Sequence, residues 1–358
     1  MNANTSRQSP AERENGTELF SRTARDLPAG RHQFHKERLM AQIQQEQHIP
    51  AAAAAPRRRR LTRPVIALPV LATAVAAAFV AVSLTQGQEA PGGLGTGPVL
   101  TTPVGVASTA GLPQLVDRIA LAAAEETHPE VGPGQYVYVE SKDAGTYVKV
   151  DHGKPSLVGM ELHTRQVWES ADGTKGWLID PAVNDDPEGE TLSLPDEQGN
   201  TPEATLNAPS YDYLTKLTTD PDALLAKIYK ETEGMGNSPD QQAFTTIGDL
   251  LNESYPPAKL YPALFKAAAK IPGVVVVNDA VDAAGRHGVA VARLDEHGGA
   301  REEWIFDKKT HVFLGERSVQ VEGSSGEGGL IRPGTVISTS AVMKRAVVDG
   351  LKETPSGR

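Results

Sequence analysis

The chain has 358 residues, no cysteine, and 45 acidic against 35 basic side chains, giving a formal net charge of −10. The lack of cysteine excludes disulfide scaffolds, thiolate zinc sites and cysteine nucleophiles. Charge is unevenly divided, because residues 1–64 carry 12 Lys and Arg against 6 Asp and Glu, whereas the remainder carries 23 against 39. The acidic larger part argues against nucleic acid as a partner.

Residues 1–64 are mostly polar, which predicts a largely disordered cytoplasmic segment. One amphipathic helix is predicted at about residues 31–47. Its apolar positions, which we take as hypothetical partner-binding residues, are Phe34, Leu39, Met40 and Ile43. Nothing else in the segment offers this face an apolar contact. The helix therefore binds a partner, lies on the membrane surface, or forms only transiently, and the sequence leaves these three interpretations open.

Residues 65–85 predict a single transmembrane helix. The run from Val65 to Leu84 is uncharged and mostly apolar, and at about 1.5 Å per residue it spans about 30 Å, the hydrocarbon thickness of a bilayer. Arginines at 57–60 and 63 precede it, and such basic flanks stay in the cytoplasm. We expect a cell-membrane protein with a cytoplasmic N-terminus and an extracytoplasmic C-terminal domain. A cleaved signal peptide is the alternative, which the long preceding segment disfavours.

After the predicted membrane span, residues 86–111 are rich in Gly, Pro, Thr and Ser, which indicates a flexible linker. We expect the extracytoplasmic domain at 112–350 and a disordered tail at 351–358. The domain opens with a predicted helix at 112–126, with a proline in its first turn.

The pattern then changes to the alternation typical of strands. Residues 136–140 and 147–150 are predicted to pair, with Asp143–Gly145 as the turn between them. A second hairpin is predicted from 165–169 and 176–179, since an Asp-Gly pair lies between them. Its two tryptophans are expected to face each other as ordinary cross-strand packing.

Three helices and then a second group of strands follow. The helices are predicted at 221–232, 240–252 and 257–270, and the strands at 274–277, 288–294, 302–306, 311–321 and 335–348. A turn at Asp307–Thr310 should make the two strands around it antiparallel. The fold class is therefore α+β: a curved, half-barrel-like antiparallel sheet packed on a helical layer, preceded by one transmembrane helix. The sequence leaves open whether the exported part is one domain or two.

Motifs for catalysis or metal binding are lacking in the sequence. It has no Ser-x-x-Lys, His-Glu-x-x-His or Walker-type glycine loop, and the histidines lack ligand spacing. Glu302 and Glu303 are adjacent on a predicted strand, so they point to opposite faces and cannot act as an acid and base pair. We expect no catalytic, cofactor-binding or metal-binding residues and no cofactor.

Several segments resemble an uncharacterised actinobacterial family of single-pass membrane proteins with a polar N-terminal segment and an exported α+β domain. They are Gly134–Tyr138, Arg165–Ser170, Asp220–Leu225, Ile271–Val274, Val281–Gly288 and Trp304–Asp307. The order of segments also resembles that of membrane-anchored anti-sigma factors, whose short cytoplasmic part holds a sigma factor. The sheet is loosely similar to the half-barrel of lipoprotein carriers and periplasmic stress regulators.

These observations favour a non-enzymatic cell-envelope sensor or regulator. Its cytoplasmic segment would engage a sigma factor or other regulator, and its outer domain an envelope lipid or protein. The alternative is an envelope lipid-binding or cell-wall assembly protein whose cytoplasmic segment is a passive leader, which predicts a sizeable apolar cavity beneath the sheet. An exported enzyme is a third interpretation and would require a pocket with converging Asp, His and Ser side chains.

Overall fold

A computed structural model of the chain describes residues 94–126, 128–184, 186–192, 203–326 and 329–355. The predicted cytoplasmic segment and the predicted transmembrane helix lie outside these residues. Within the described ranges, no helix is long and apolar enough to cross a membrane.

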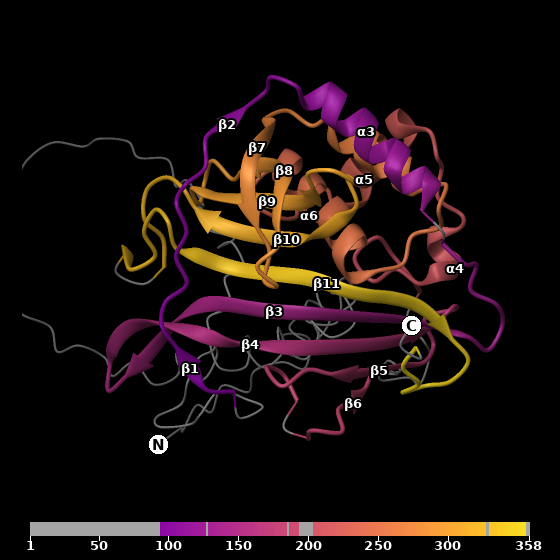
Figure 1. Cartoon of the computed structure of the whole chain (residues 1–358), viewed down its shortest axis with the longest axis horizontal. Helices are drawn as coiled ribbons and strands as arrows, with labels where there is room; N and C mark the ends of the chain where they lie inside the picture. The colour runs from indigo at the N-terminus through magenta and orange to yellow at the C-terminus, as the bar shows by residue number, and fades with distance from the viewer. Residues whose placement is uncertain (1–93, 127, 185, 193–202, 327–328, 356–358) are drawn as a thin grey trace, which may run out of the picture.

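Eleven strands of the described residues form one antiparallel sheet, in the order β2-β7-β8-β9-β10-β11-β3-β4-β5-β6, with β1 added beside β4. The strands are β1 (Thr96–Gly97), β2 (Ala107–Ser108), β3 (Tyr136–Asp151), β4 (Lys154–Ser170), β5 (Gly176–Ile179), β6 (Glu190–Thr191), β7 (Val274–Val281), β8 (His287–Leu294), β9 (Ala300–Asp307), β10 (Phe313–Gln320) and β11 (Val336–Val348). The sheet is open and does not close into a barrel (Figure 1). The predicted α+β class is confirmed.

The described residues form five helices, α3 (Leu112–Glu125), α4 (Tyr211–Leu214), α5 (Pro221–Glu231), α6 (Pro239–Glu253) and α7 (Tyr261–Ala268). Of these, α4, α5 and α6 begin at a capping side chain. The Asp220 side chain accepts a hydrogen bond from the backbone of Ala223 at the start of α5, and Ser238 caps α6 in the same way. In both, proline occupies the first turn, where a missing N–H costs nothing.

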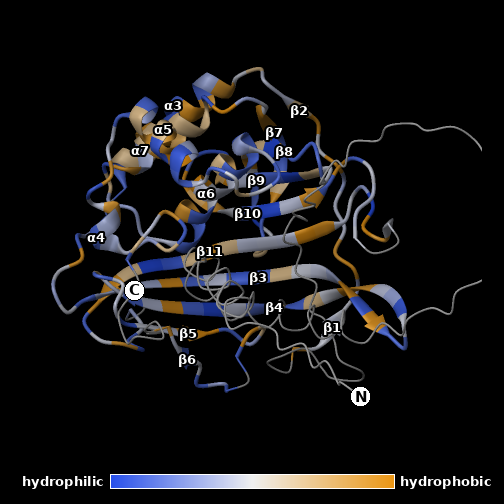
Figure 2. Ribbon diagram, turned by 180° about the vertical axis from the view of Figure 1, so that it is seen from behind, coloured by the Kyte–Doolittle hydropathy of each residue, from blue (hydrophilic) through white to orange (hydrophobic). Residues whose placement is uncertain are grey.

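The main core lies between the helices and the strands β7 to β9. Figure 1 shows α3, α5 and α6 gathered beside this half of the sheet, and Figure 2 shows hydrophobic and hydrophilic residues alternating along β3, β4 and β11. Phe244 of α6 stacks on Trp304 of β9 at a centroid distance of 3.9 Å, and both side chains are fully buried. Such aromatic contacts add about 0.5–1.5 kcal/mol beyond the area they bury. They fix α6 on the sheet.

The predicted turn at Asp143–Gly145 is wrong. Strand β3 runs without interruption from Tyr136 to Asp151, and these residues form an irregularity in its pairing with β4. Asp-Ala-Gly is a turn sequence locally, but β3 is paired with β4 on one side and β11 on the other, and this pairing overrides the local preference. The chain reverses instead at His152 and Gly153, both of which have positive φ.

The second hairpin is confirmed. Trp168 of β4 lies directly opposite Trp177 of β5, and the Asp172 side chain accepts hydrogen bonds from the Thr174 backbone and hydroxyl within the turn. Trp168 is fully buried, and its indole N–H donates to the carbonyl of Glu353 at 2.6 Å. Glu353, which lies within the predicted disordered tail at 351–358, is therefore held against the sheet.

The described part of the predicted linker, residues 94–111, lies along the sheet as a strap. Besides forming β1 and β2, it bonds through the Thr102 backbone N–H to Gly334 and through the Leu100 carbonyl to Val336. Backbone pairing needs no particular side chain. A composition rich in Gly, Pro and Thr therefore does not reveal that this segment pairs with the sheet. We call residues 94–111 the strap.

A fully buried ion triad lies on the sheet face away from α6. Glu303 accepts from Arg301 Nε at 2.8 Å and from Arg317 Nε at 2.7 Å. The two arginines also bond the strap, at the Gly105 carbonyl and the Thr102 hydroxyl. Glu302, on the opposite face, accepts instead from side chains of α6, as its position on the strand predicts.

Candidate functional site

The predicted partner-binding residues Phe34, Leu39, Met40 and Ile43 lie outside the described residues, so their role stays a prediction. Over the described ranges, no group of three or more His, Asp or Glu side chains is arranged to hold a metal ion. The candidate site is a groove that the sequence alone does not indicate.

The groove arises where two neighbouring strands separate. Strands β10 and β11 pair only at Arg317–Val319, opposite Val336–Thr339. Beyond this point β11 continues beside β3 to Val348 without pairing to β10 (Figure 1). Arg286 bridges the separation, because its Nη2 donates to the carbonyl of Leu314 in β10 at 2.8 Å and to that of Val342 in β11 at 3.0 Å.

The resulting cavity has a volume of about 730 Å³ and is partly open to solvent. Its walls come from the end of α3, from α7, from the start of β10 and from β11. Pockets of about 300–1,000 Å³ are the usual size for small-molecule sites. The groove therefore has room for a ligand of that class.

Aromatic rings form the helical wall of the groove. The His128 ring stacks on Tyr261 at a centroid distance of 4.6 Å and meets Tyr255 edge to face at 5.9 Å. Phe265, on the same face of α7 one turn later, and Phe313, at the start of β10, extend this apolar surface. Tyr255, Tyr261 and Phe265 are each at most 4% exposed, so the half-buried Phe313 offers the most ring surface of these four aromatic residues to an apolar chain.

Basic side chains outnumber acidic ones in the lining. Arg286, Lys344 and Arg345 line the groove, against Glu126 as the acid, although the chain after residue 64 is strongly acidic. Arg286 is engaged in an ion pair with Asp282 at 2.6 Å, whereas Lys344 donates only to a neutral backbone carbonyl, that of Pro355, at 2.9 Å. The positive charges still available to a ligand are those of Lys344 and Arg345.

Arg345 is held in place but is not neutralised. Its Nη2 donates to the carbonyls of Leu251 and Asn252 at the end of α6, and its guanidinium lies 5.7 Å from the centre of the Phe313 ring. Within the described part of the chain, it forms no ion pair, and its buried Nε has no hydrogen-bond partner. An unpartnered buried donor costs about 1–3 kcal/mol, so it marks a place where a missing partner would be stabilising.

A second unpartnered donor lies in the same wall. Tyr261 is 3% exposed, and its hydroxyl has no hydrogen-bond partner among the described residues. Burial raises the pKa of Tyr261 above its usual value of 10, so the phenol carries its proton at neutral pH. At the groove rim, Glu126 Oε2 lies 3.5 Å from His128 Nε2, a buried ring nitrogen that makes no well-formed hydrogen bond with any described residue. The contact with His128 and, more weakly, the charge of Arg345 lower the pKa of the Glu126 carboxyl.

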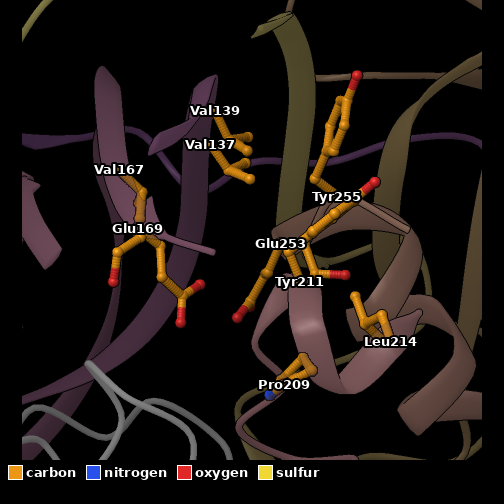
Figure 3. A pocket seen from close by; sticks show the side chains of 11 residues that line it. Val137, Val139, Val167, Glu169, Pro209, Tyr211, Leu214, Glu253 and Tyr255 are labelled. Atoms are coloured by element: carbon orange, nitrogen blue, oxygen red, sulfur yellow. The ribbon is translucent and has the colours of Figure 1, made fainter. Parts of the chain in front are cut away.

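A much smaller cavity of about 10 Å³ lies beside the groove, with Tyr255 in the wall of both. Figure 3 shows Val137, Val139 and Glu169 on its strand side, opposite Tyr211 and other residues of the helical side. Its volume is about that of one water. Burial, and secondarily the negative charge of Asp172, raises the pKa of Glu169 to about 8. This carboxyl is a buried acid without room for a substrate.

Sequence analysis did not identify the residues of the groove. His128 is one of several histidines without ligand spacing, and Tyr261 fits the apolar face of an ordinary amphipathic helix. Arg345 lies on a strand whose neighbouring residues are of mixed polarity. His128 and Arg345, the extremes of this set, are more than two hundred residues apart in the sequence, and the groove that they share opens where β10 and β11 stop pairing. No local signal predicts where that pairing ends.

No family model and no curated protein matches the chain. Among solved structures, a chain of "The complex structure of Pseudomonas aeruginosa MucA/MucB" is similar over 69% of this chain, with 11% sequence identity and a TM-score of 0.24. The similarity covers 59% of the length of that chain. The TM-score is too low for this similarity to carry an argument about fold or function. The resemblance to an actinobacterial membrane-protein family stays a prediction.

Proposed function

We propose that the protein is a non-enzymatic sensor or regulator of the cell envelope. In this proposal residues 65–85 anchor it in the cell membrane, the outer domain binds a ligand in the groove, and the cytoplasmic segment engages a sigma factor or another regulator. The observation that carries the proposal is the groove of about 730 Å³ with unpartnered donors in its wall. A binding role requires a shaped cavity and no catalytic group.

The cytoplasmic half of the proposal rests on the amphipathic pattern at 31–47 and on the basic flank of the predicted span. An apolar helical face without an intramolecular contact is a common way to dock in a partner's groove. Sensing would couple occupancy of the outer groove to the partner held inside. The strap, which follows the predicted span closely in the chain, is the covalent connection between the two.

The test is crosslinking in intact cells from a photoreactive residue at Leu39, followed by mass spectrometry of the captured molecules. We expect capture of a sigma factor or other transcription regulator, with the signal lost in Phe34→Asp. The same photoreactive residue at Glu14, outside the predicted helix, is the matched control. Capture of lipid alone at Leu39, or equal capture at both positions, would overturn the regulatory role.

The second candidate is an envelope lipid-binding or assembly protein with a passive leader. The size of the groove and its aromatic wall favour it as much as they favour a sensor. Deleting residues 1–50, which leaves the basic flank in place, separates the two candidates. A sensor loses its transcriptional effect on this deletion, whereas the passive-leader protein keeps its full envelope phenotype.

A further inference from the structure

We propose that the groove binds an anionic amphiphile: a ligand with a carboxylate or phosphate head and at least one apolar chain. This inference rests on the proposed binding function and names the ligand class of that site. Two unpartnered donors, an apolar wall and the charge balance of the lining support it.

The head-group position is defined by Arg345 and Tyr261. Both side chains line the groove, and each holds a buried donor, Nε–H and O–H respectively, that no described residue satisfies. Two donors match an acceptor with two or more oxygens, as a carboxylate or phosphate has. The half-buried Arg345 is the member that an entering ligand meets first, and Tyr261, at 3% exposure, lies deeper.

The preference for an anion follows from what surrounds these donors. Arg345 supplies a cation without an ion pair among the described residues, and neither donor can be satisfied by a positively charged head group. Glu126, the acidic side chain of the lining, lies 3.5 Å from His128, and the contact with His128 and then the charge of Arg345 lower the pKa of its carboxyl. An anion is therefore the ligand that completes the unsatisfied groups of the site.

The preference for an apolar chain follows from the remaining walls. Beyond the donors, about half of the exposed lining is apolar, and the residues that supply it include Phe265, Val312, Phe313, Leu314, Ala346 and Val347. A simple inorganic anion would leave most of the cavity of about 730 Å³ unfilled. A chain packed along these residues would remove apolar surface from water at about 25 cal/mol per Å². A peptide with an acidic end is the competing occupant, and crosslinking in cells distinguishes it.

The test uses the full chain in phosphatidylcholine nanodiscs with three diazirine-bearing probes of equal chain length. The probes are a C18 fatty acid, a phosphatidylglycerol with the same acyl chain, and the corresponding C18 alcohol as the uncharged control. After irradiation, labelled peptides are mapped by mass spectrometry. We expect at least tenfold more label from one or both acids than from the alcohol, within residues 255–265 and 342–347. Whichever of the two acidic probes gives more label shows whether the groove prefers a carboxylate or a phosphate head group.

Two substitutions test the assigned head-group contacts. Arg345→Gln and Tyr261→Phe should each reduce labelling by the anionic probes about tenfold and leave labelling by the alcohol unchanged. Arg332→Gln, at an exposed arginine outside the groove, is the matched control and should change nothing. Tyr261→Phe removes a hydroxyl that no described residue bonds, so the thermal midpoint of the free protein should stay or rise. A purely structural tyrosine would give a lower midpoint.

Equal labelling by all three probes, labelling outside the groove, or no effect of either substitution would overturn the proposal. Recovery from cells of a peptide crosslinked in the groove would show that a peptide is the ligand, and this result would also overturn the proposal. These outcomes leave the crosslinking result at Leu39 unaffected. Failure of the ligand assignment is therefore distinguishable from failure of the proposed regulatory function.

Discussion

Replacing Glu303 with glutamine should destabilise the protein more than the same replacement at any exposed carboxyl group. Glu303 is 0% exposed, and it accepts from two arginines that are 5% and 3% exposed. The substitution keeps the size of the side chain but removes its charge. Two guanidinium groups would then remain buried side by side without a counter-ion.

The magnitude follows from the burial of the triad. Removing one partner of a buried ion pair costs about 3–5 kcal/mol, because the remaining charge is uncompensated. For a domain of this size, each kcal/mol lowers the thermal midpoint by about 2–4 °C, so Glu303→Gln should lower it by about 6–20 °C. Both arginines also bond the strap, so the strap should become more accessible to protease.

The assay is thermal and guanidinium unfolding of the full chain in mild detergent, followed by tryptophan fluorescence. The three tryptophans of the chain, Trp168, Trp177 and Trp304, lie on strands of the sheet, so their emission reports its loss. Glu302→Gln is the matched control, because it makes the same substitution at the neighbouring residue. The Glu302 side chain lies on the opposite face of the sheet, where it accepts hydrogen bonds from polar side chains of α6. A free energy of unfolding for Glu303→Gln within about 1 kcal/mol of either the wild type or Glu302→Gln would refute the reasoning.

Buried groups elsewhere in the domain give three further expectations. Because Glu169 has its pKa raised to about 8, it is protonated in the folded chain over a range where the unfolded chain ionises it. The free energy of unfolding should therefore fall, by at most about 5 kcal/mol in total, as pH rises from about 4.5 to 8. Glu169→Gln should abolish this dependence on pH. Denaturation series at about pH 5, 7 and 9 test it. Deleting the chain from Glu353 onward should cost about 1–3 kcal/mol and shift tryptophan emission, because the buried indole N–H of Trp168 loses its acceptor; an unchanged midpoint would contradict this. Gly248→Ala should destabilise α6 although alanine favours helices by about 1 kcal/mol, because the added Cβ would lie 2.5 Å from the Nε1 atom of Trp304, and a higher unfolding midpoint would refute that prediction.

Helices α3, α5 and α6 were predictable because their signals are local, whereas the short α4 was not predicted and α7 begins at Tyr261 rather than at the predicted residue 257. Helices α5 and α6 each begin with a capping side chain followed by proline, and the structure has them within a residue or two of the predicted bounds. The second hairpin was predictable for the same reason, since an Asp-Gly turn fixes which strands pair and places Trp168 opposite Trp177.

The failures lie where long-range pairing decides the local conformation. Asp143–Gly145 has a turn sequence, but the chain stays extended there because strands lie on both sides of it. A Cβ at Gly145 would lie 2.9 Å from the carbonyl oxygen of Ile337 in β11. Glycine is therefore needed here because the two strands lie close together, and not because the chain reverses its direction. The composition of the strap likewise predicts a linker, because backbone pairing leaves no side-chain pattern.

The groove lay beyond sequence reasoning for a related reason. Its existence depends on β10 and β11 separating after a few paired residues, and its chemistry depends on which donors are left without partners. Both properties belong to the assembled fold. The absence of catalytic motifs in the sequence predicts a binding role, and a substrate turned over in the groove would refute that prediction.

The central claim, that the groove is a ligand site, is tested most directly by a photoreactive residue at Met343 of the full chain in cells. Met343 lines the groove and is 41% exposed, whereas Leu162, at 52% exposure on β4, lies outside the groove and serves as the control. After irradiation, the intact mass of the purified protein is measured. We predict a defined adduct of an anionic amphiphile at Met343 that is lost in Arg345→Gln and absent at Leu162. No adduct, or the same adduct at both positions, would contradict the claim.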